Sequence, residues 1–185
     1  MALDSVQLLS TAAAPSADQA LAWLAFARWL PALRLVRAVE GGALRAWLPP
    51  GAGQVAAEHL PPGTQVALLD CLLQADGASA GADARWHYVV ETDVLPEYEH
   101  EFNAWYEQEH LPGLAQVPGT VAALRLLSRE AGPRYHACYD LVSPETLGSP
   151  PWLAVRATPW SSRIRAAFRN TRRSMYQRFD LPLSL

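Results

Sequence analysis

The hydrophobic pattern is clearest in the second part of the chain, where it predicts a strand followed by a helix. The run 86–94 is rich in aromatic and β-branched residues, which is typical of a strand. Pro96 suits the first turn of a helix. Aromatic side chains then recur at spacings of four and three residues and form one apolar stripe: Tyr98, Phe102 and Trp105. Because Pro112 cannot continue this helix and disfavours helical geometry just before it, we expect the helix to end near His110.

Turn signals after this helix predict the rest of a four-stranded unit. Two dipeptides, Pro118-Gly119 and Gly132-Pro133, each mark a turn, so the runs that follow them are expected to pair as antiparallel strands. The expected elements are strands at Thr120–Ser128, Arg134–Val142 and Asn170–Phe179, with helical structure between Ser143 and Phe168. The order β-α-β-β-α-β is the ferredoxin-like arrangement.

The first part of the chain predicts the same order in a weaker form. A stretch of small and acidic residues, 75–84, cannot bury anything large and is interpreted as a flexible linker. We therefore expect two units, 1–74 and 85–185, of which the second is the more complete. The expected elements of the first are strands at Val6–Thr11, Leu33–Val39, Ala43–Leu48 and Thr64–Leu73, a helix at Ala17–Leu30 and a short helix at Gln54–Leu60.

Matching residues at one constant offset suggest that the two units arose by duplication. The matches, in order, are Thr11 with Thr92, Pro15 with Pro96, Leu30-Pro31 with Leu111-Pro112 and, after one residue of slippage, Ala43-Leu44-Arg45 with Ala123-Leu124-Arg125. Their ungapped order favours a tandem duplication in which the first half has degenerated. The expected fold class is α+β, with two ferredoxin-like units in tandem.

Composition excludes several classes of protein. Half of the 185 residues are apolar and seven are tryptophan, which excludes general disorder. The net charge of −3 gives no electrostatic reason to expect nucleic acid or an anionic membrane, and the arginines near the C-terminus are interpreted as a solvated face. The N-terminal residues lack the pattern of a signal peptide, and no apolar run is long enough to span a membrane. We therefore expect a cytoplasmic protein without a membrane or nucleic-acid partner.

Motifs for common cofactors are missing from the sequence. It has no P-loop, no GxGxxG, no GxSxG and no lysine, so nucleotide-dependent and pyridoxal-phosphate chemistry are disfavoured. Cys71 and Cys138 have no CxxC spacing and are expected to be free, buried thiols. The two ExxH pairs, which end at His100 and His110, lie too far apart along and around a helix to share one ion. No metal site and no cofactor is predicted.

The run Asn103–Pro112, followed by Val117-Pro118-Gly119, resembles the dimeric α+β barrel superfamily. The likeness is greatest to EthD-type and antibiotic-biosynthesis-monooxygenase-type proteins. It implies two ferredoxin-like sheets that face each other as a barrel, with helices outside. One chain would supply both sheets as a monomeric pseudo-dimer, or two chains would pair as a homodimer. Relatives with sites place them between the sheet and the helices of one unit.

Three polar residues of the predicted helix, Asn103, Tyr106 and His110, share one face because their spacings are three and four residues. We expect His110 to transfer protons, and Tyr106 and Asn103 to orient a substrate. A structural interpretation of His110 stands beside this one: at a helix end, an imidazole caps free carbonyls and is favoured by the helix dipole. The matching positions of the first half hold other residues, so one site per chain is expected: Ala22, Ala25 and Trp29.

Four further residues are expected to bind the substrate: Trp105, Tyr139, Tyr88 and Arg125. On their strands, Tyr88 faces opposite to His87, and Tyr139 faces opposite to Asp140. The pattern leaves open which of these faces meets the helices. A structural interpretation fits the same pattern: the tyrosines would be buried in the core, with their hydroxyl groups hydrogen-bonded to the protein.

The resemblance implies one of two functions. The first is a cofactor-independent monooxygenase or isomerase that acts on a small apolar or aromatic molecule. The alternative is a non-catalytic ligand-binding or scaffold protein that keeps the fold without the chemistry. Degeneration of the first half favours the alternative, whereas the polar helix face of the second half favours an enzyme.

Overall fold

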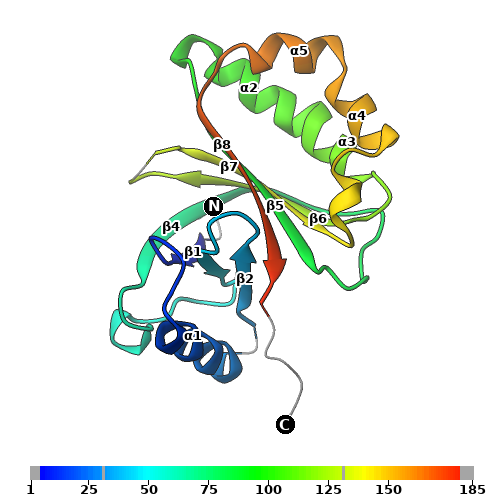
Figure 1. Cartoon of the computed structure of the whole chain (residues 1–185). Helices are drawn as coiled ribbons and strands as arrows, with labels where there is room; N and C mark the ends of the chain where they lie inside the picture. Colours follow the sequence, from blue (N-terminus) through cyan, green and yellow to red (C-terminus); the bar gives the residue numbers. More distant parts are fainter. Residues whose placement is uncertain (1–4, 31, 131, 180–185) are drawn as a thin grey trace.

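The computed structural model describes residues 5–30, 32–130 and 132–179. Within them, eight strands form one closed barrel, and the helices lie on its outside (Figure 1). The outer ends of the two predicted units, 1–4 and 180–185, lie outside the described residues, as does Pro31 of the repeat alignment. The described part confirms the expected α+β class, with antiparallel strands and external helices.

The barrel is built from two neighbouring sets of four strands. Its strands are β1 (Ser5–Ser10), β2 (Arg34–Ala38), β3 (Leu44–Trp47), β4 (Gln65–Asp76), β5 (Trp86–Val94), β6 (Thr120–Ser128), β7 (Tyr135–Leu141) and β8 (Phe168–Arg178). Their order around the barrel is β1-β3-β2-β8-β5-β7-β6-β4, and every pairing is antiparallel. Each half therefore has the ferredoxin-like strand order, and the halves join where β2 meets β8 and β4 meets β6.

The helices cover the two halves unequally. The first half carries α1 (Ala17–Trp29), which begins at a capping box between Ser16 and Gln19. The second half carries α2 (Glu99–Trp105), the π turn η3 (Tyr106–His110), α3 (Leu111–Ala115), α4 (Pro150–Arg156) and α5 (Pro159–Arg165). In Figure 1 these lie together on one side of the barrel, with α1 on the opposite side. No helix among the described residues is both long and apolar enough to cross a bilayer.

The second helix of the first half is reduced to a single turn, Ala57–His59, which is shorter than the expected helix 54–60. Prolines and glycines on both sides of this segment leave too few residues for a longer helix. Gln7 of β1 holds the segment in place, because its Nε2 donates to the Val55 carbonyl at 2.9 Å and its Oε1 accepts from the Val55 amide at 2.8 Å. A loop therefore covers part of the sheet where the second half has helices.

The Gln7 amide is expected to keep this loop closed. Gln7→Ala removes both hydrogen bonds and should cost about 1–2 kcal/mol, because the half-buried Val55 backbone groups lose their partners. Hydrogen exchange of the Val55 amide should accelerate in the variant, while the β5 amides keep their protection. Gln54→Ala is the control, since Gln54 is exposed and lies in the same loop. Equal exchange in the wild type and in Gln7→Ala would contradict this role.

The repeat alignment holds at the first strand and helix but is wrong after them. Ala43-Leu44-Arg45 runs into β3, the third strand of its half, whereas Ala123-Leu124-Arg125 lies in β6, the second strand of the other half. The register is lost because η3 and α3 make the helical part of the second half longer than α1. A common origin for the halves thus rests on their shared strand order and remains a proposal.

The predicted linker is more ordered than a flexible connector. Ala75 and Asp76 belong to β4 and pair with β6. Gly77 and Ser79 then donate backbone hydrogen bonds of 2.9 Å to Val121 and Thr120. A Cβ at Gly77 would lie 2.1 Å from the Thr120 carbonyl oxygen, so glycine is required for this close approach. The connection between the halves is therefore fastened to the start of β6.

The structure shows which face of each strand in the second half packs against the helices. Tyr88, Tyr135 and Tyr139 pack in the core between the second half's sheet and its helices. The alternate residues point into the barrel, where apolar side chains such as Val89 and Leu126 form a separate core. Two ion pairs join the halves, Arg34 with Asp140 and Arg45 with Glu91, and the His87 and His136 rings lie beside the same two carboxylates.

Candidate functional site

The π turn η3 carries Tyr106 and His110 and lies in the middle of a continuous helical segment. The segment runs to Ala115, so the prediction that the helix ends near His110 was wrong. The Leu111 amide donates to the Tyr106 carbonyl, five residues back, and this widened turn lets the helix continue past Pro112. π turns of this kind occur often at functional sites.

His110 is buried rather than placed at a helix end. Its side chain is 7% exposed and stacks on the Trp105 indole, with the ring centroids 4.0 Å apart. No hydrogen-bond partner for its Nδ1 exists among the described residues. Since the helix continues past it, the capping interpretation is wrong. Burial, together with the charges of Arg156, Arg165 and Arg125, lowers the pKa of His110 to about 3, so the imidazole is neutral at physiological pH.

A cavity of about 30 Å³ lies beneath η3, between the helices and the sheet of the second half. His110, Tyr139 and Trp152 are among the side chains that line it. Each of them holds a buried polar atom without a partner in the described structure: His110 Nδ1, Tyr139 OH and Trp152 Nε1. The described residues hold only five unsatisfied buried side-chain atoms, and three of the five belong to residues that line this one cavity. Because buried polar groups are normally hydrogen-bonded, this clustering calls for an explanation.

The cavity is surrounded by positive charge. Three arginines are among its lining residues, Arg156, Arg165 and Arg173, and none of the residues that line it is acidic. Burial raises the pKa of Tyr139 well above its ordinary value and also raises the pKa of Tyr88. Both phenols are therefore protonated hydrogen-bond donors at neutral pH. A site of donors and cations favours a ligand that accepts hydrogen bonds and carries or develops negative charge.

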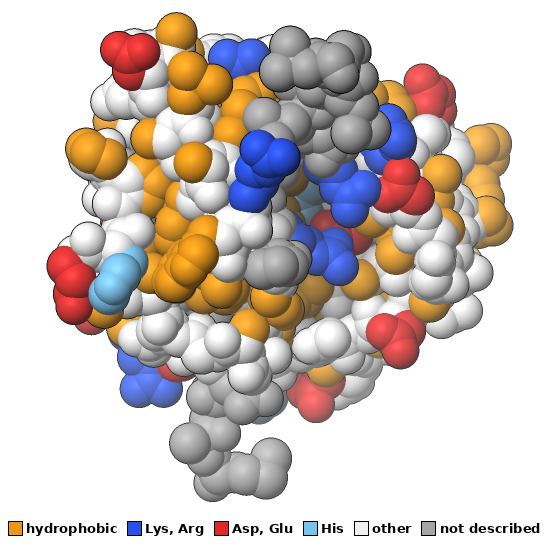
Figure 2. Space-filling model, turned by 90° about the horizontal axis from the view of Figure 1, so that it is seen from below, with side chains coloured by type: hydrophobic (Ala, Val, Ile, Leu, Met, Phe, Trp, Pro, Cys, Tyr) orange, Lys and Arg blue, Asp and Glu red, His pale blue; other side chains and the backbone are white. Residues whose placement is uncertain are grey.

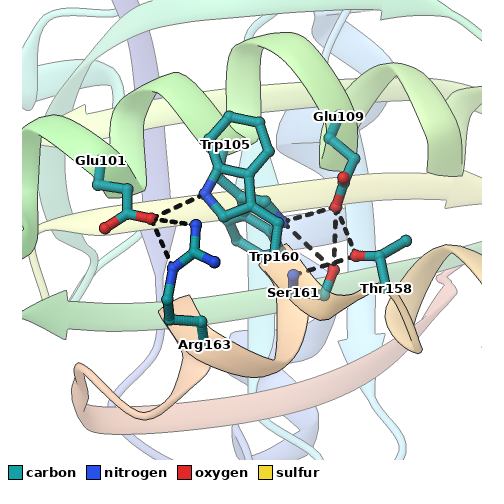
Figure 3. A network of polar contacts seen from close by, with 7 residues as sticks. All are labelled: Glu101, Trp105, Glu109, Thr158, Trp160, Ser161 and Arg163. Carbon is teal, nitrogen blue, oxygen red and sulfur yellow. Dashed lines mark hydrogen bonds and ion pairs between the residues drawn. The ribbon is translucent and has the colours of Figure 1, made fainter.

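A polar network fixes Trp105, the ring on which His110 stacks (Figure 3). Trp105 Nε1 lies 3.2 Å from both Glu109 Oε1 and Ser161 Oγ. Thr158, the N-cap of α5, donates to the same Glu109 oxygen at 2.6 Å. A second set of bonds ties α5 to α2: Trp160 and Arg163 both donate to Glu101. The network holds α5 against the helix that carries η3 and so keeps the wall of the cavity in place.

The predicted site residues fall into two groups. Tyr88, Trp105, Tyr106, His110 and Tyr139 line the cavity together. Two others do not line it: Asn103 and Arg125.

Arg125 instead sits in an aromatic box beside the cavity. Its guanidinium lies 4.3 to 4.9 Å from the ring centroids of Phe102, Tyr106 and Tyr135 and donates to Asn103 Oδ1 at 2.6 Å. Asn103 is therefore occupied by Arg125, and its predicted part in orienting a substrate has no geometric support. The box is a cation–π arrangement that stabilises a buried charge, and no carboxylate of the described residues forms an ion pair with Arg125.

Sequence reasoning missed the lining residues of the second helical region. The arginine run near the C-terminus was visible, but a solvated face is the commoner meaning of such a run. Trp152 carried a signal only in being a tryptophan near the start of a proline-initiated helix. In the described residues, no three His, Cys, Asp or Glu side chains cluster as metal ligands do. In the ExxH pair that ends at His110, the histidine is buried whereas Glu107 is exposed, so the two side chains lie in different environments.

No protein-family model matches the chain, and no curated protein matches its sequence. Solved structures match over nearly its whole length. A ferredoxin-fold protein related to antibiotic biosynthesis monooxygenases, from Listeria monocytogenes, is 12% identical with a TM-score of 0.64, covering 98% of this chain and 97% of its own. An anthrone oxidase-like protein is 18% identical with a TM-score of 0.58, covering 100% and 98%.

A haem-degrading enzyme from Listeria monocytogenes has the same fold, with 10% identity and a TM-score of 0.59 over 95% of this chain and 99% of its own. At such identities the likeness establishes the fold alone. The chain thus has the ferredoxin-like α+β fold found in monooxygenase-related proteins.

Proposed function

We propose that the cavity beneath η3 is the active site of a cofactor-independent oxygenase for a small aromatic molecule with an acidic C–H group. The observation that carries the proposal is the convergence of three unsatisfied polar atoms, on His110, Tyr139 and Trp152, at one cavity. Buried polar groups without partners are costly, so their concentration favours a site kept for a ligand. The monooxygenase-related neighbours agree with this class of reaction.

The substrate class follows from the lining. An aromatic ketone whose CH₂ group is acidified by the neighbouring carbonyl gives a delocalised anion when it loses a proton. Its oxygen would accept hydrogen bonds from Tyr139 and Trp152, while the arginines at the cavity stabilise the negative charge. Anthrone, which the name of one structural neighbour contains, belongs to this class. The reaction is R₂CH₂ + O₂ → R₂C=O + H₂O, in which one oxygen atom enters the product and the other leaves as water.

His110 is the group proposed to take the proton. Its pKa of about 3 keeps His110 neutral and able to accept a proton. A substrate anion formed beside it raises its pKa and favours the imidazolium. Trp105 holds the ring by stacking, so the accepting nitrogen is fixed in direction. This assigns proton transfer to His110 and apolar positioning to Trp105.

The volume of about 30 Å³ admits only the reacting group of such a substrate. The rest of the molecule must displace side chains at the mouth of the cavity. Arg173 is exposed, and an exposed side chain of this kind changes rotamer rapidly, whereas Arg165 is held by hydrogen bonds to the Ser161 and Arg156 carbonyls. We therefore expect the substrate to enter beside Arg173, which then closes over it.

Oxygen consumption with anthrone as the probe tests this proposal. Wild-type protein should consume one O₂ per carbonyl product. Tyr139→Phe and His110→Phe should each lower kcat/KM by about 10²-fold, because each removes one polar group from the reaction. His100→Phe, in the same helical segment but exposed, is the matched control and should change the rate less than twofold.

The proposal is contradicted if the wild type does not turn over anthrone or related aromatic ketones. It is also contradicted if Tyr139→Phe is as active as the wild type, or if His100→Phe and His110→Phe lose equal activity. The reduction of the first half, whose second helix is a single turn, is the observation that favours the alternative, a protein that binds without turnover. That alternative predicts saturable binding of the aromatic ketone, weakened by Tyr139→Phe, and no oxygen uptake.

Haem does not fit the cavity as it stands. Sites for small molecules and cofactors usually enclose about 300–1,000 Å³. The cavity is far smaller, and the face of the His110 ring is covered by Trp105. No step is therefore assigned to haem.

A further inference from the structure

A second cavity, of about 650 Å³, lies at the end of the barrel beside α1 and is unrelated to the first. It shares no lining residue with the cavity beneath η3. Residues of both halves form it, including Arg28 of α1, Arg34 of β2, and Arg85 just before β5. Figure 2 shows the molecule from this side, hollowed, with basic side chains gathered around the hollow. Its volume is in the range of cavities that hold small molecules.

The charge of this cavity is positive. Among the lining residues are four arginines, Arg28, Arg34, Arg85 and Arg178, and two aspartates, Asp83 and Asp140. Arg34 is paired with Asp140, while Arg85 and Arg178 both contact Asp83. No ion pair of Arg28 occurs within the described part of the chain. The lining therefore has an excess of cations, which favours an anionic ligand.

The inner wall of the cavity combines a fixed histidine with flat apolar side chains. His87 Nδ1 lies 2.7 Å from Asp140 Oδ1, and both residues are buried. Because Asp140 is also bound by Arg34, it is the accepting carboxylate, and the His87 Nδ1–H is the donor. Trp47 covers the His87 ring at 3.9 Å between centroids, and Trp86 also lines the cavity. The pairing uses Nδ1 and leaves His87 Nε2 outside this hydrogen bond.

We propose that this cavity is a second binding site, for a small organic acid with a flat apolar body. The carboxylate would face Arg28 and Arg34, and the apolar body would lie along Trp47 and Trp86. The proposal does not depend on oxygenase activity, since it uses none of the residues of the first cavity. It assigns the barrel end to recognition of an acid, separate from the reaction proposed above.

Calorimetric titration with 2-naphthoate, read also by tryptophan fluorescence, tests the proposal. We expect saturable binding of one naphthoate per chain and at least about fivefold weaker binding of neutral 2-naphthamide. Arg28→Glu should weaken naphthoate binding by at least about fivefold, with Arg28→Gln between it and wild type. Arg28 is exposed, so these variants should fold normally.

Arg172→Glu is the matched control, because Arg172 is exposed, lies on β8 outside the cavity, and changes the net charge equally. It should alter naphthoate binding by less than about twofold. His110→Phe should leave naphthoate binding unchanged, which separates this site from the first. The proposal is overturned by an absence of saturable binding, by equal effects of Arg28→Glu and Arg172→Glu, or by loss of binding in His110→Phe alone.

Discussion

Replacing His110 by phenylalanine is expected to reduce the decrease in the free energy of unfolding that occurs when the pH is lowered into the mildly acidic range. In the folded protein the pKa of His110 is lowered from 6.5 to about 3, mainly by burial. Between these pH values the unfolded chain binds a proton at this residue and the folded chain does not. The free energy of unfolding therefore falls as the pH drops below about 6.5, by up to about 1.4 kcal/mol per pH unit from this one group.

Urea unfolding at a series of pH values measures this effect. Between pH 6.5 and pH 5 the wild type should lose about 1.6 kcal/mol more than His110→Phe. Phenylalanine keeps an aromatic ring against Trp105 but cannot titrate, and it also removes the unsatisfied Nδ1. His136, whose pKa burial also lowers, is present in both proteins and cancels in the comparison.

His100→Phe provides the control, because His100 is exposed in the same helical segment. Its unfolding free energy should follow the wild-type pH dependence. Parallel curves for the wild type and His110→Phe would mean that His110 is protonated in the folded state at pH 5, against the burial described. The same result would remove the neutral imidazole from the proposed reaction.

The fold was largely predictable because its signals are local. Turn dipeptides such as Pro118-Gly119 and the run 86–94 placed the strands of the second half close to β5, β6 and β7. Ferredoxin-like order then follows from the sequence of strands and helices. The first half was harder, since its second helix has shrunk to one turn and the Gln7 clamp that replaces it joins residues far apart in the chain.

The helix end and the role of His110 were not predictable from local rules. Proline normally ends a helix, and only the widened turn η3 allows Pro112 to follow without a break. A π turn leaves no clear mark in the residue pattern. Once the helix continues, His110 changes from a terminal cap to a buried side chain, and both its neighbours and its pKa change with it.

The candidate site was predicted in part for a related reason. Spacing on one helix brought Tyr106 and His110 together correctly, and strand alternation restricted Tyr88 and Tyr139 to one face each. Asn103 also fits the spacing, but its amide is taken by Arg125, a tertiary contact that no spacing rule contains. Trp152 and the arginines come from α4, α5 and β8, so only the folded chain places them at the cavity.

Removing the charge of Asp140 is expected to weaken the link between the two halves of the barrel. Asp140 is buried and binds His87 of its own half and Arg34 of the other. Burial raises the pKa of its carboxyl, but hydrogen bonding by His87 and the nearby arginine charges outweigh burial and leave the pKa lowered, so Asp140 is ionised at neutral pH. Asp140→Asn keeps the shape and removes the charge, which leaves Arg34 without its counter-ion.

The expected cost is about 3 kcal/mol at pH 7, the lower end of the range for breaking a buried pair, because Arg34 is half-exposed and regains water. Urea unfolding with separate probes tests whether the halves come apart: Trp23 and Trp29 of α1 report one half, and Trp152 of α4 reports the other. Asp83→Asn, exposed and also paired with arginines, is the control and should leave the unfolding midpoint unchanged. If Asp140→Asn unfolds at the wild-type midpoint, the contact between Arg34 and Asp140 contributes nothing to the closed barrel, and the barrel is held by strand pairing and apolar packing alone.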